Sequence, residues 1–285
     1  MLELRAGSAR ARIAAHGAEL KGWSVAGREL MWEAGAVWPQ TAPVLFPVVG
    51  WSRNGVVRIG GASFPMGVHG FAAQTMFSPV SITPDHVRLE ARDDEATRAH
   101  YPFAFRLTLD YALTQTQIRS VTLVENTGDA PMPYACGLHP GFRWPFAGGA
   151  AEDYAVLFDR DERTNVPVIA PGGLISPRTK MVTLQDGRLA LRPDLFAIDA
   201  LAFLDARSQS VTFTNGAAAI IVARENYPHV ALWSRGGAPF LCIESWTSHS
   251  DVEGFCGELA QRPFMRVLAP GARARHAATY AWRAG

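Results

Sequence analysis

The stretch Phe103-Ala104-Phe105-Arg106-Leu107-Thr108-Leu109-Asp110-Tyr111-Ala112-Leu113 alternates large apolar side chains with smaller or polar ones. Alternation with a period of two is typical of a β-strand that buries one face. A short polar turn follows it, and a second apolar segment runs over residues 118–125. The two segments predict an antiparallel β-hairpin.

The same period recurs along most of the chain. We expect further strands at residues 11–13, 19–25, 56–59, 87–91, 154–158, 201–204, 211–214, 218–222, 229–233, 240–246 and 273–282. Turn sequences such as Asn126-Thr127-Gly128-Asp129 and Asn215-Gly216 separate them, where residues that tolerate positive φ are needed. No long amphipathic helix is expected. Many short strands separated by turns predict an all-β fold, a large antiparallel sandwich or a barrel-like architecture.

Composition and charge exclude several classes of protein. Apolar residues make up 48% of the 285 residues, which fits a well-packed core. The formal net charge of +1 and the lack of Lys/Arg runs disfavour nucleic-acid and anionic-membrane partners. No linker or repeat divides the chain, so a single domain over residues 1–285 is expected, as a monomer or homodimer.

The three cysteines and the N-terminus indicate where the protein works. Cys136, Cys242 and Cys256 are too few and too irregularly spaced for a disulfide framework or a zinc site. No signal-peptide pattern and no membrane-length apolar stretch occur. We therefore expect a cytoplasmic protein without a metal. No motif for an organic cofactor occurs either.

One carboxylate lies in a segment that otherwise resembles a buried strand, Ala238-Pro239-Phe240-Leu241-Cys242-Ile243-Glu244-Ser245-Trp246. Strand geometry predicts that Phe240, Cys242, Glu244 and Trp246 share one face. A glutamate there is paired, protonated or exposed to a cleft. It is either a working residue or a structural one neutralised by a neighbouring arginine, and this segment alone does not decide.

Two histidines lie beside glycines, which let other groups approach closely. They are His139 in Gly137-Leu138-His139-Pro140-Gly141 and His69 in Val68-His69-Gly70-Phe71. An imidazole near neutrality can donate a proton while a carboxylate removes another, as isomerisation at a sugar carbon requires. Taken alone, each histidine is more often a hydrogen-bonded structural residue than a catalyst, and only Glu244 in the same argument favours the catalytic interpretation. His249 and Asp251 could supply two metal ligands, but no third or fourth is evident.

Aromatic side chains accompany these motifs, and sugar rings pack their apolar faces on such side chains. Those near the candidate residues are Trp51, Phe71, Trp144, Trp233 and Trp246. Singly each is an ordinary core residue, whereas together they favour a carbohydrate cleft.

Four motifs in order resemble the aldose 1-epimerase (galactose mutarotase-like) superfamily, nearest its LacX-like branch. They are residues 42–50 (APVLFPVVG), 69–72 (HGFA), 137–142 (GLHPGF) and 238–246 (APFLCIESW). The similarity extends from Gly17-Ala18-Glu19-Leu20 to Leu268-Ala269-Pro270-Gly271 and so spans nearly the whole chain. It implies a two-sheet β-supersandwich with a shallow sugar cleft and no organic cofactor.

The resemblance also implies residue roles. Glu244 would be the general base that takes the proton from the anomeric hydroxyl, and His139 the general acid that protonates the ring oxygen. His69 would bind the substrate, with Phe71 and Trp246 in the same motifs. The reaction would interconvert the α and β anomers of an aldohexose or a related sugar.

Arginines common in the family are replaced here. Gln40 and Trp51 occupy two of those positions and Ala73 a third, while Arg53 and Arg143 lie close by in the sequence. We expect Gln40, Trp51 and Arg53 to contact the sugar. Loss of arginines disfavours a phosphorylated sugar, because guanidinium groups bind such anions in bidentate fashion. Hexose-6-phosphate epimerisation and non-catalytic sugar binding stay as alternatives.

Overall fold

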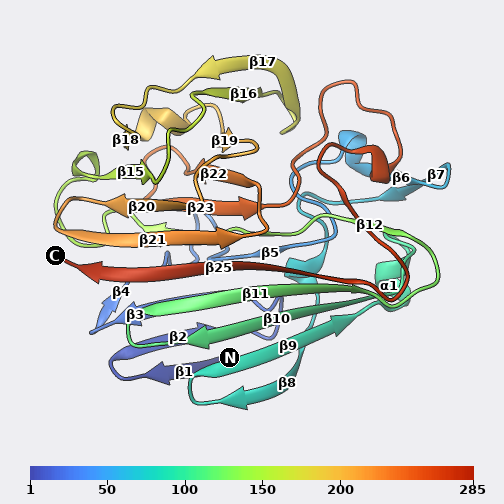
Figure 1. The fold of residues 1–285 in the computed structure, drawn as a ribbon, viewed down its shortest axis with the longest axis horizontal. Coiled ribbons are helices and arrows are strands. Elements are labelled where there is room, and N and C mark those ends of the chain that lie inside the picture. Colours follow the sequence, from blue (N-terminus) through green and yellow to red (C-terminus); the bar gives the residue numbers. More distant parts are fainter.

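The structure, a computed structural model, describes all of residues 1–285. Its largest element is an antiparallel sheet of nine strands. In spatial order these are β18 (Arg188–Ala190), β15 (Ala155–Phe158), β20 (Ser210–Thr214), β21 (Ala218–Glu225), β25 (Arg273–Ala284), β11 (Gln117–Asn126), β10 (Phe105–Leu113), β9 (His86–Arg92) and β8 (Ser78–Thr83). Figure 1 shows β25, β11, β10 and β9 side by side across the molecule.

A second sheet carries the segments that the sequence marks as functional. Its strands are β19 (Leu201–Phe203), β22 (His229–Trp233), β23 (Phe240–Trp246), β13 (Gly137–Leu138) and β5 (Val44–Leu45), with β14 (Gly141–Arg143) also paired to β23. Because β23 lies at the centre, its neighbours on both sides hold it by backbone hydrogen bonds.

Smaller elements flank the two sheets. A four-stranded sheet contains β1 (Leu2–Ala6), β2 (Ala9–Ile13), β3 (Leu20–Val25) and β4 (Arg28–Glu29). The remaining pairs are β6 (Val56–Ile59) with β7 (Ala62–Pro65), β12 (Met132–Tyr134) with β24 (Arg266–Leu268), and β16 (Asn165–Ile169) with β17 (Ile175–Met181). Helices are short: α1 (Glu95–Arg98) and the 3-10 turns η1 (Arg53–Gly55), η2 (Ala72–Gln74), η3 (Ala151–Asp153), η4 (Pro193–Phe196) and η5 (Leu259–Gln261).

The β10–β11 hairpin confirms the prediction from alternation. Leu107 pairs with Val124 and Leu113 with Ile118, and all four side chains are buried. Arg106, on the opposite face, forms ion pairs at the surface. The hydrophobic effect therefore fixes the register, since a slip by one residue would expose every apolar side chain of the hairpin.

One apolar core of 58 buried residues contains side chains from both large sheets. Leu107 and Leu109 of β10 belong to it, as do Leu241 and Ile243 of β23. The predicted all-β fold, a large antiparallel sandwich, is thus confirmed. The face of β23 away from this core is left to line a cleft.

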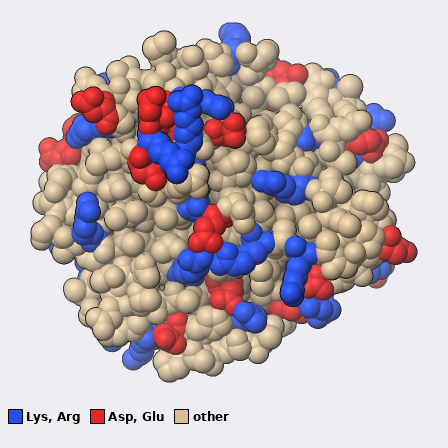
Figure 2. Space-filling view, viewed as in Figure 1, with Lys and Arg blue, Asp and Glu red and all other residues tan.

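The viewed surface carries no large patch of one charge. Figure 2 shows Lys and Arg side chains intermixed with Asp and Glu, in keeping with the net charge of +1. No helix of the structure is long and apolar enough to cross a membrane.

Candidate active site

Strand β23 points Glu244 away from the main core. Leu241 and Ile243 enter that core, whereas Phe240 and Cys242 belong to a separate apolar cluster on the opposite face. Glu244 lies on this second face with Trp246, whose indole Nε1 donates a hydrogen bond to Glu244 Oε2 at 3.0 Å. The strand parity expected from the sequence is therefore present.

His139 comes into contact with Glu244 through sheet pairing. In β13, Leu138 pairs with Ser245 of β23, and His139 follows directly. Its Nε2 lies 3.2 Å from Glu244 Oε2, and both side chains are almost completely buried. The ring stacks at a tilt against Trp38, with 5.1 Å between the ring centroids. The carboxyl and the imidazole thus form one unit at the floor of the cleft.

Burial changes the acidity of both groups. Removal from water raises the pKa of Glu244 well above its ordinary value, the indole hydrogen bond opposes that rise, and the Asp199 carboxylate adds to it. Burial lowers the pKa of His139, and nearby His69 lowers it further. Burial therefore favours the uncharged form of each group, a protonated carboxyl beside a neutral imidazole, and this pair shares one transferable proton. Shifts of this kind are typical of catalytic groups.

His69 is held in one tautomer. The backbone N–H of Gly50 donates to His69 Nδ1 at 3.0 Å, so Nδ1 carries no proton and Nε2 carries one in the neutral ring. Desolvation lowers the pKa of His69 to about 4, which keeps the ring neutral near pH 7. Its backbone adopts φ +64°, and its ring meets His139 edge-on at 5.5 Å between centroids. His69 is therefore a fixed hydrogen-bond donor beside the Glu244–His139 pair.

These residues lie in a cleft of about 330 Å³, a volume suited to a small ligand. Of the residues singled out from the sequence, the cleft contains Glu244, His139, His69, Gln40, Trp51, Trp233 and Trp246. Trp51 is 46% exposed and stands at the rim. The indoles and the central acid–base pair give the cleft apolar walls and a polar floor.

Two expected contacts lie elsewhere. Arg53 does not line the cleft: its Nη1 donates to the carbonyl oxygen of Phe255 at 3.2 Å, in a neighbouring pocket. Phe71 packs on Phe46 and Phe105 at the margin of the core. Arg53 and Phe71 were expected in the cleft because they are close in sequence to Trp51 and His69. This expectation was wrong, because the chain turns between Trp51 and Arg53 and between His69 and Phe71.

Two aromatic or basic residues named near the motifs are likewise outside the cleft. Arg143 pairs with Glu33 at 3.4 Å, and Trp144 is buried against Phe196. His249 and Asp251 do not combine as ligands, since His249 Nδ1 lies 2.8 Å from the Ser250 carbonyl oxygen and Asp251 pairs with Arg262. No group of three or more His, Cys, Asp or Glu side chains is arranged to hold a metal ion.

The cleft also contains polar and aromatic residues that the sequence did not single out. Trp38 lies against His139, Asp199 precedes β19, and Arg235 lies in the turn between β22 and β23. Arg235 Nη1 donates to the carbonyl oxygen of Val37 at 3.1 Å, and no carboxylate pairs with it. All three come from irregular segments, where no periodicity indicates the direction of a side chain. The one local feature of the sequence that could have drawn attention to any of them is the Gly236-Gly237 turn beside Arg235.

The fold and the cleft together define a β-sandwich protein with an acid–base pair in a sugar-sized cleft. The family model described as aldose 1-epimerase matches residues 1–281, so the chain belongs to the aldose 1-epimerase family. Family membership supports a mutarotase-like isomerase that acts on a sugar.

Relatives agree with this assignment and with the LacX-like branch. The chromosomal protein LacX of Lactococcus lactis subsp. lactis is 29% identical over 237 residues, which cover 79% of each chain. A galactose mutarotase related enzyme from Lactobacillus acidophilus superposes with a TM-score of 0.91 at 27% identity, covering 99% of this chain and 97% of the other. A galactose mutarotase-like protein from Lactobacillus casei gives a TM-score of 0.91 at 24% identity, covering 99% and 100%, and supports the fold.

Proposed function

We propose that the protein is an aldose 1-epimerase that interconverts the α and β anomers of a free aldohexose or a related sugar. The observation that carries this proposal is the 3.2 Å separation of His139 Nε2 and Glu244 Oε2. Mutarotation needs a base at the anomeric hydroxyl and an acid at the ring oxygen, and both oxygens are bonded to the same carbon. An acid and a base side by side fit two such oxygens.

One proton shared by Glu244 and His139 is enough to complete the catalytic cycle. Transfer of the shared proton from Glu244 to His139 first gives a carboxylate and an imidazolium. Glu244 then takes the proton of the anomeric hydroxyl while His139 gives its proton to the ring oxygen, and the C1–O5 bond breaks. The open-chain aldehyde then rotates about its C1–C2 bond. On reclosure His139 recovers the proton from the O5 hydroxyl and Glu244 returns one to the carbonyl oxygen, which yields the other anomer. No redox cofactor enters this balance.

The other cleft residues bind and orient the ring. Trp51 and Trp233 supply apolar surfaces for it, and the fixed Nε2–H of His69 donates to a sugar oxygen. Gln40 and Asp199 are available for hydroxyl groups. Trp246 keeps the Glu244 carboxyl in one orientation through its indole hydrogen bond, so we infer a positioning role for it.

Exchange NMR or polarimetry on a panel of free aldoses tests the proposal. We expect faster anomer interconversion than the spontaneous rate for at least one sugar. Unchanged rates with all of them would refute it. Sugar binding that persists without turnover would instead favour the carbohydrate-sensor alternative.

A hexose 6-phosphate is the second candidate substrate, and Arg235 is the observation that favours it. This guanidinium lies in the cleft without a carboxylate partner and could pair with a phosphoryl group. The test compares KM for a free hexose with KM for its 6-phosphate, in the wild type and in Arg235→Gln. Loss of a preference for the phosphate in the variant would support this candidate.

A further inference from the structure

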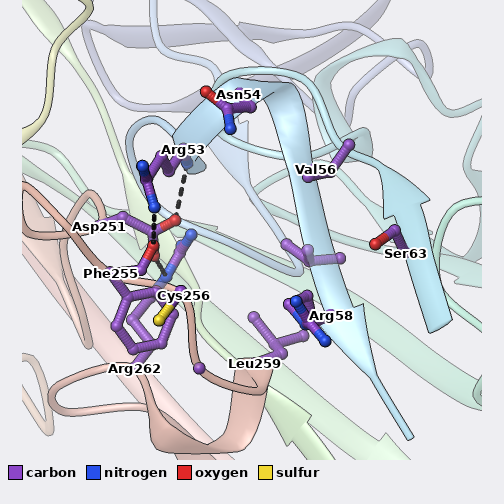
Figure 3. Close-up of a pocket in the computed structure, with 12 residues that line it drawn as sticks. Arg53, Asn54, Val56, Arg58, Ser63, Asp251, Phe255, Cys256, Leu259 and Arg262 are labelled. Carbon is purple, nitrogen blue, oxygen red and sulfur yellow. Dashed lines mark hydrogen bonds and ion pairs between the residues drawn. The ribbon is translucent and has the colours of Figure 1, made fainter. Parts of the chain in front are cut away.

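A second pocket, of about 230 Å³, lies outside the cleft. Its walls come from two distant parts of the chain, residues 53–63 around η1 and the β6–β7 hairpin, and residues 251–262 (Figure 3). It contains three arginines, Arg53, Arg58 and Arg262, and we call it the arginine pocket. None of its residues lines the cleft.

Most of the positive charge in the arginine pocket is not neutralised. Its one carboxylate, Asp251, pairs through Oδ1 with Arg262 Nε at 2.6 Å and accepts the backbone N–H of Arg53 at Oδ2, at 2.7 Å. No carboxylate lies within ion-pair distance of the Arg53 or Arg58 guanidinium. Glu258 stands outside the lining and accepts from the Gly61 N–H. Three guanidinium groups against one carboxylate leave a net charge of +2.

The floor of the pocket is built rigidly. Arg262 and Asp251 expose only 1% and 4% of their side chains, and Arg262 Nη2 also donates to Ser52 Oγ at 2.8 Å. Arg262 Nη1, also buried, has no hydrogen-bond partner. A buried charged donor without a partner is costly, and an added oxygen acceptor would reduce that cost. Hence the pocket has one buried, fixed cation, Arg262, and two exposed ones, Arg53 and Arg58.

We propose that the arginine pocket binds a phosphoryl group. The exposed Arg53 and Arg58 guanidinium groups and the Ser63 hydroxyl suit the oxygens of a tetrahedral dianion, whose charge near pH 7 matches the net +2 to which buried Arg262 contributes. The pocket is too small for a polymer. Figure 3 shows Arg53 reaching toward Asp251 and Phe255, and Arg58 lying beside Leu259. Inorganic phosphate and a small phosphate monoester both carry such a group, and titrations with each distinguish these two sources.

The pocket flanks the same two chain segments as the cleft. Gly50 and Trp51 line the cleft and Arg53 lines the pocket; in the second segment Ser250 lines the cleft and Asp251 the pocket. A bound phosphoryl group would therefore be a near neighbour of the sugar without overlapping it. A saturating free aldose is not expected to displace it.

Titration calorimetry of the full chain with inorganic phosphate, and separately with glucose 6-phosphate, measures binding. We expect saturable binding of at least one, weakened about tenfold in Arg58→Gln and in Arg53→Gln, each of which removes one charged contact. Both side chains are exposed, so the variants keep the buried Arg262–Asp251 pair. Arg235→Gln is the matched control in the cleft and should leave inorganic phosphate binding unchanged.

The reactivity of Cys256 reports whether the arginine pocket is occupied. Cys256 lines the arginine pocket and is exposed, whereas Cys136 and Cys242 are buried. Inorganic phosphate should slow the reaction of Cys256 with a neutral maleimide, and Arg58→Gln should remove this protection. Absence of saturable binding, binding unaffected by both pocket variants, or binding lost in Arg235→Gln would each overturn the proposal. None of these outcomes depends on epimerase activity.

Discussion

Replacing Glu244 by glutamine separates the chemistry of this side chain from its packing. The two side chains have nearly the same shape, and the amide oxygen can still accept the Trp246 indole N–H. The amide cannot take a proton from a sugar. General acid–base catalysis contributes about 10²- to 10⁴-fold in rate, so we expect a loss of that size in kcat, or about 3 to 5 kcal/mol in the barrier.

The Glu244→Gln variant should lose activity but gain stability. Burial raises the pKa of Glu244, so the unfolded protein releases this proton at a lower pH than the folded protein does. The wild type is therefore destabilised as pH rises above about 4.5 toward the raised pKa of the folded state, and the glutamine variant escapes that cost. We expect the variant to gain stability relative to the wild type between about pH 5 and about pH 9.

The assay combines anomer exchange by NMR with urea unfolding of the wild type and the variant at about pH 5 and at about pH 9. Glu253→Gln is the control, because Glu253 is exposed and its side chain makes no hydrogen bond in the structure. Full activity in Glu244→Gln would refute the catalytic role. A variant less stable than wild type at the higher pH would refute the argument from burial.

Three further outcomes are expected. Gly70→Ala should lower the free energy of unfolding by several kcal/mol, because a Cβ there overlaps the backbone carbonyl of Phe46. Gly60 also has a positive φ but open space around it, so Gly60→Ala should cost about 1 kcal/mol. Urea unfolding of both variants compares the two losses. Stability should fall as pH drops below 6.5, because burial lowers the pKa of His229 to about 3 and that of His276 to about 4, so the unfolded chain binds those protons first. Each histidine should lower the free energy of unfolding by roughly 3 kcal/mol or more once the pH reaches its folded-state pKa. A free energy of unfolding that does not change with pH would contradict this. Trp51→Ala should raise KM for the sugar with a smaller change in kcat, measured by steady-state exchange, and an unchanged KM would exclude stacking on this indole.

Apolar alternation and strand parity determined much of the architecture from sequence alone. The 103–113 stretch predicted the β10–β11 hairpin, and the 240–246 stretch predicted that Glu244 and Trp246 point the same way. Such inferences succeed because side chains in a strand alternate by covalent geometry, and burial then selects the face. The ordered motifs likewise indicated the family.

Tertiary structure decided what the loops contribute. Arg53 was expected in the cleft and lies in the arginine pocket, while Arg235 and Trp38, from other turns, occupy the cleft. A loop side chain has no periodic direction, and its position depends on which distant segment closes against it. The contact of His139 with Glu244 is of the same origin: it exists because β13 pairs with β23, more than a hundred residues away along the chain.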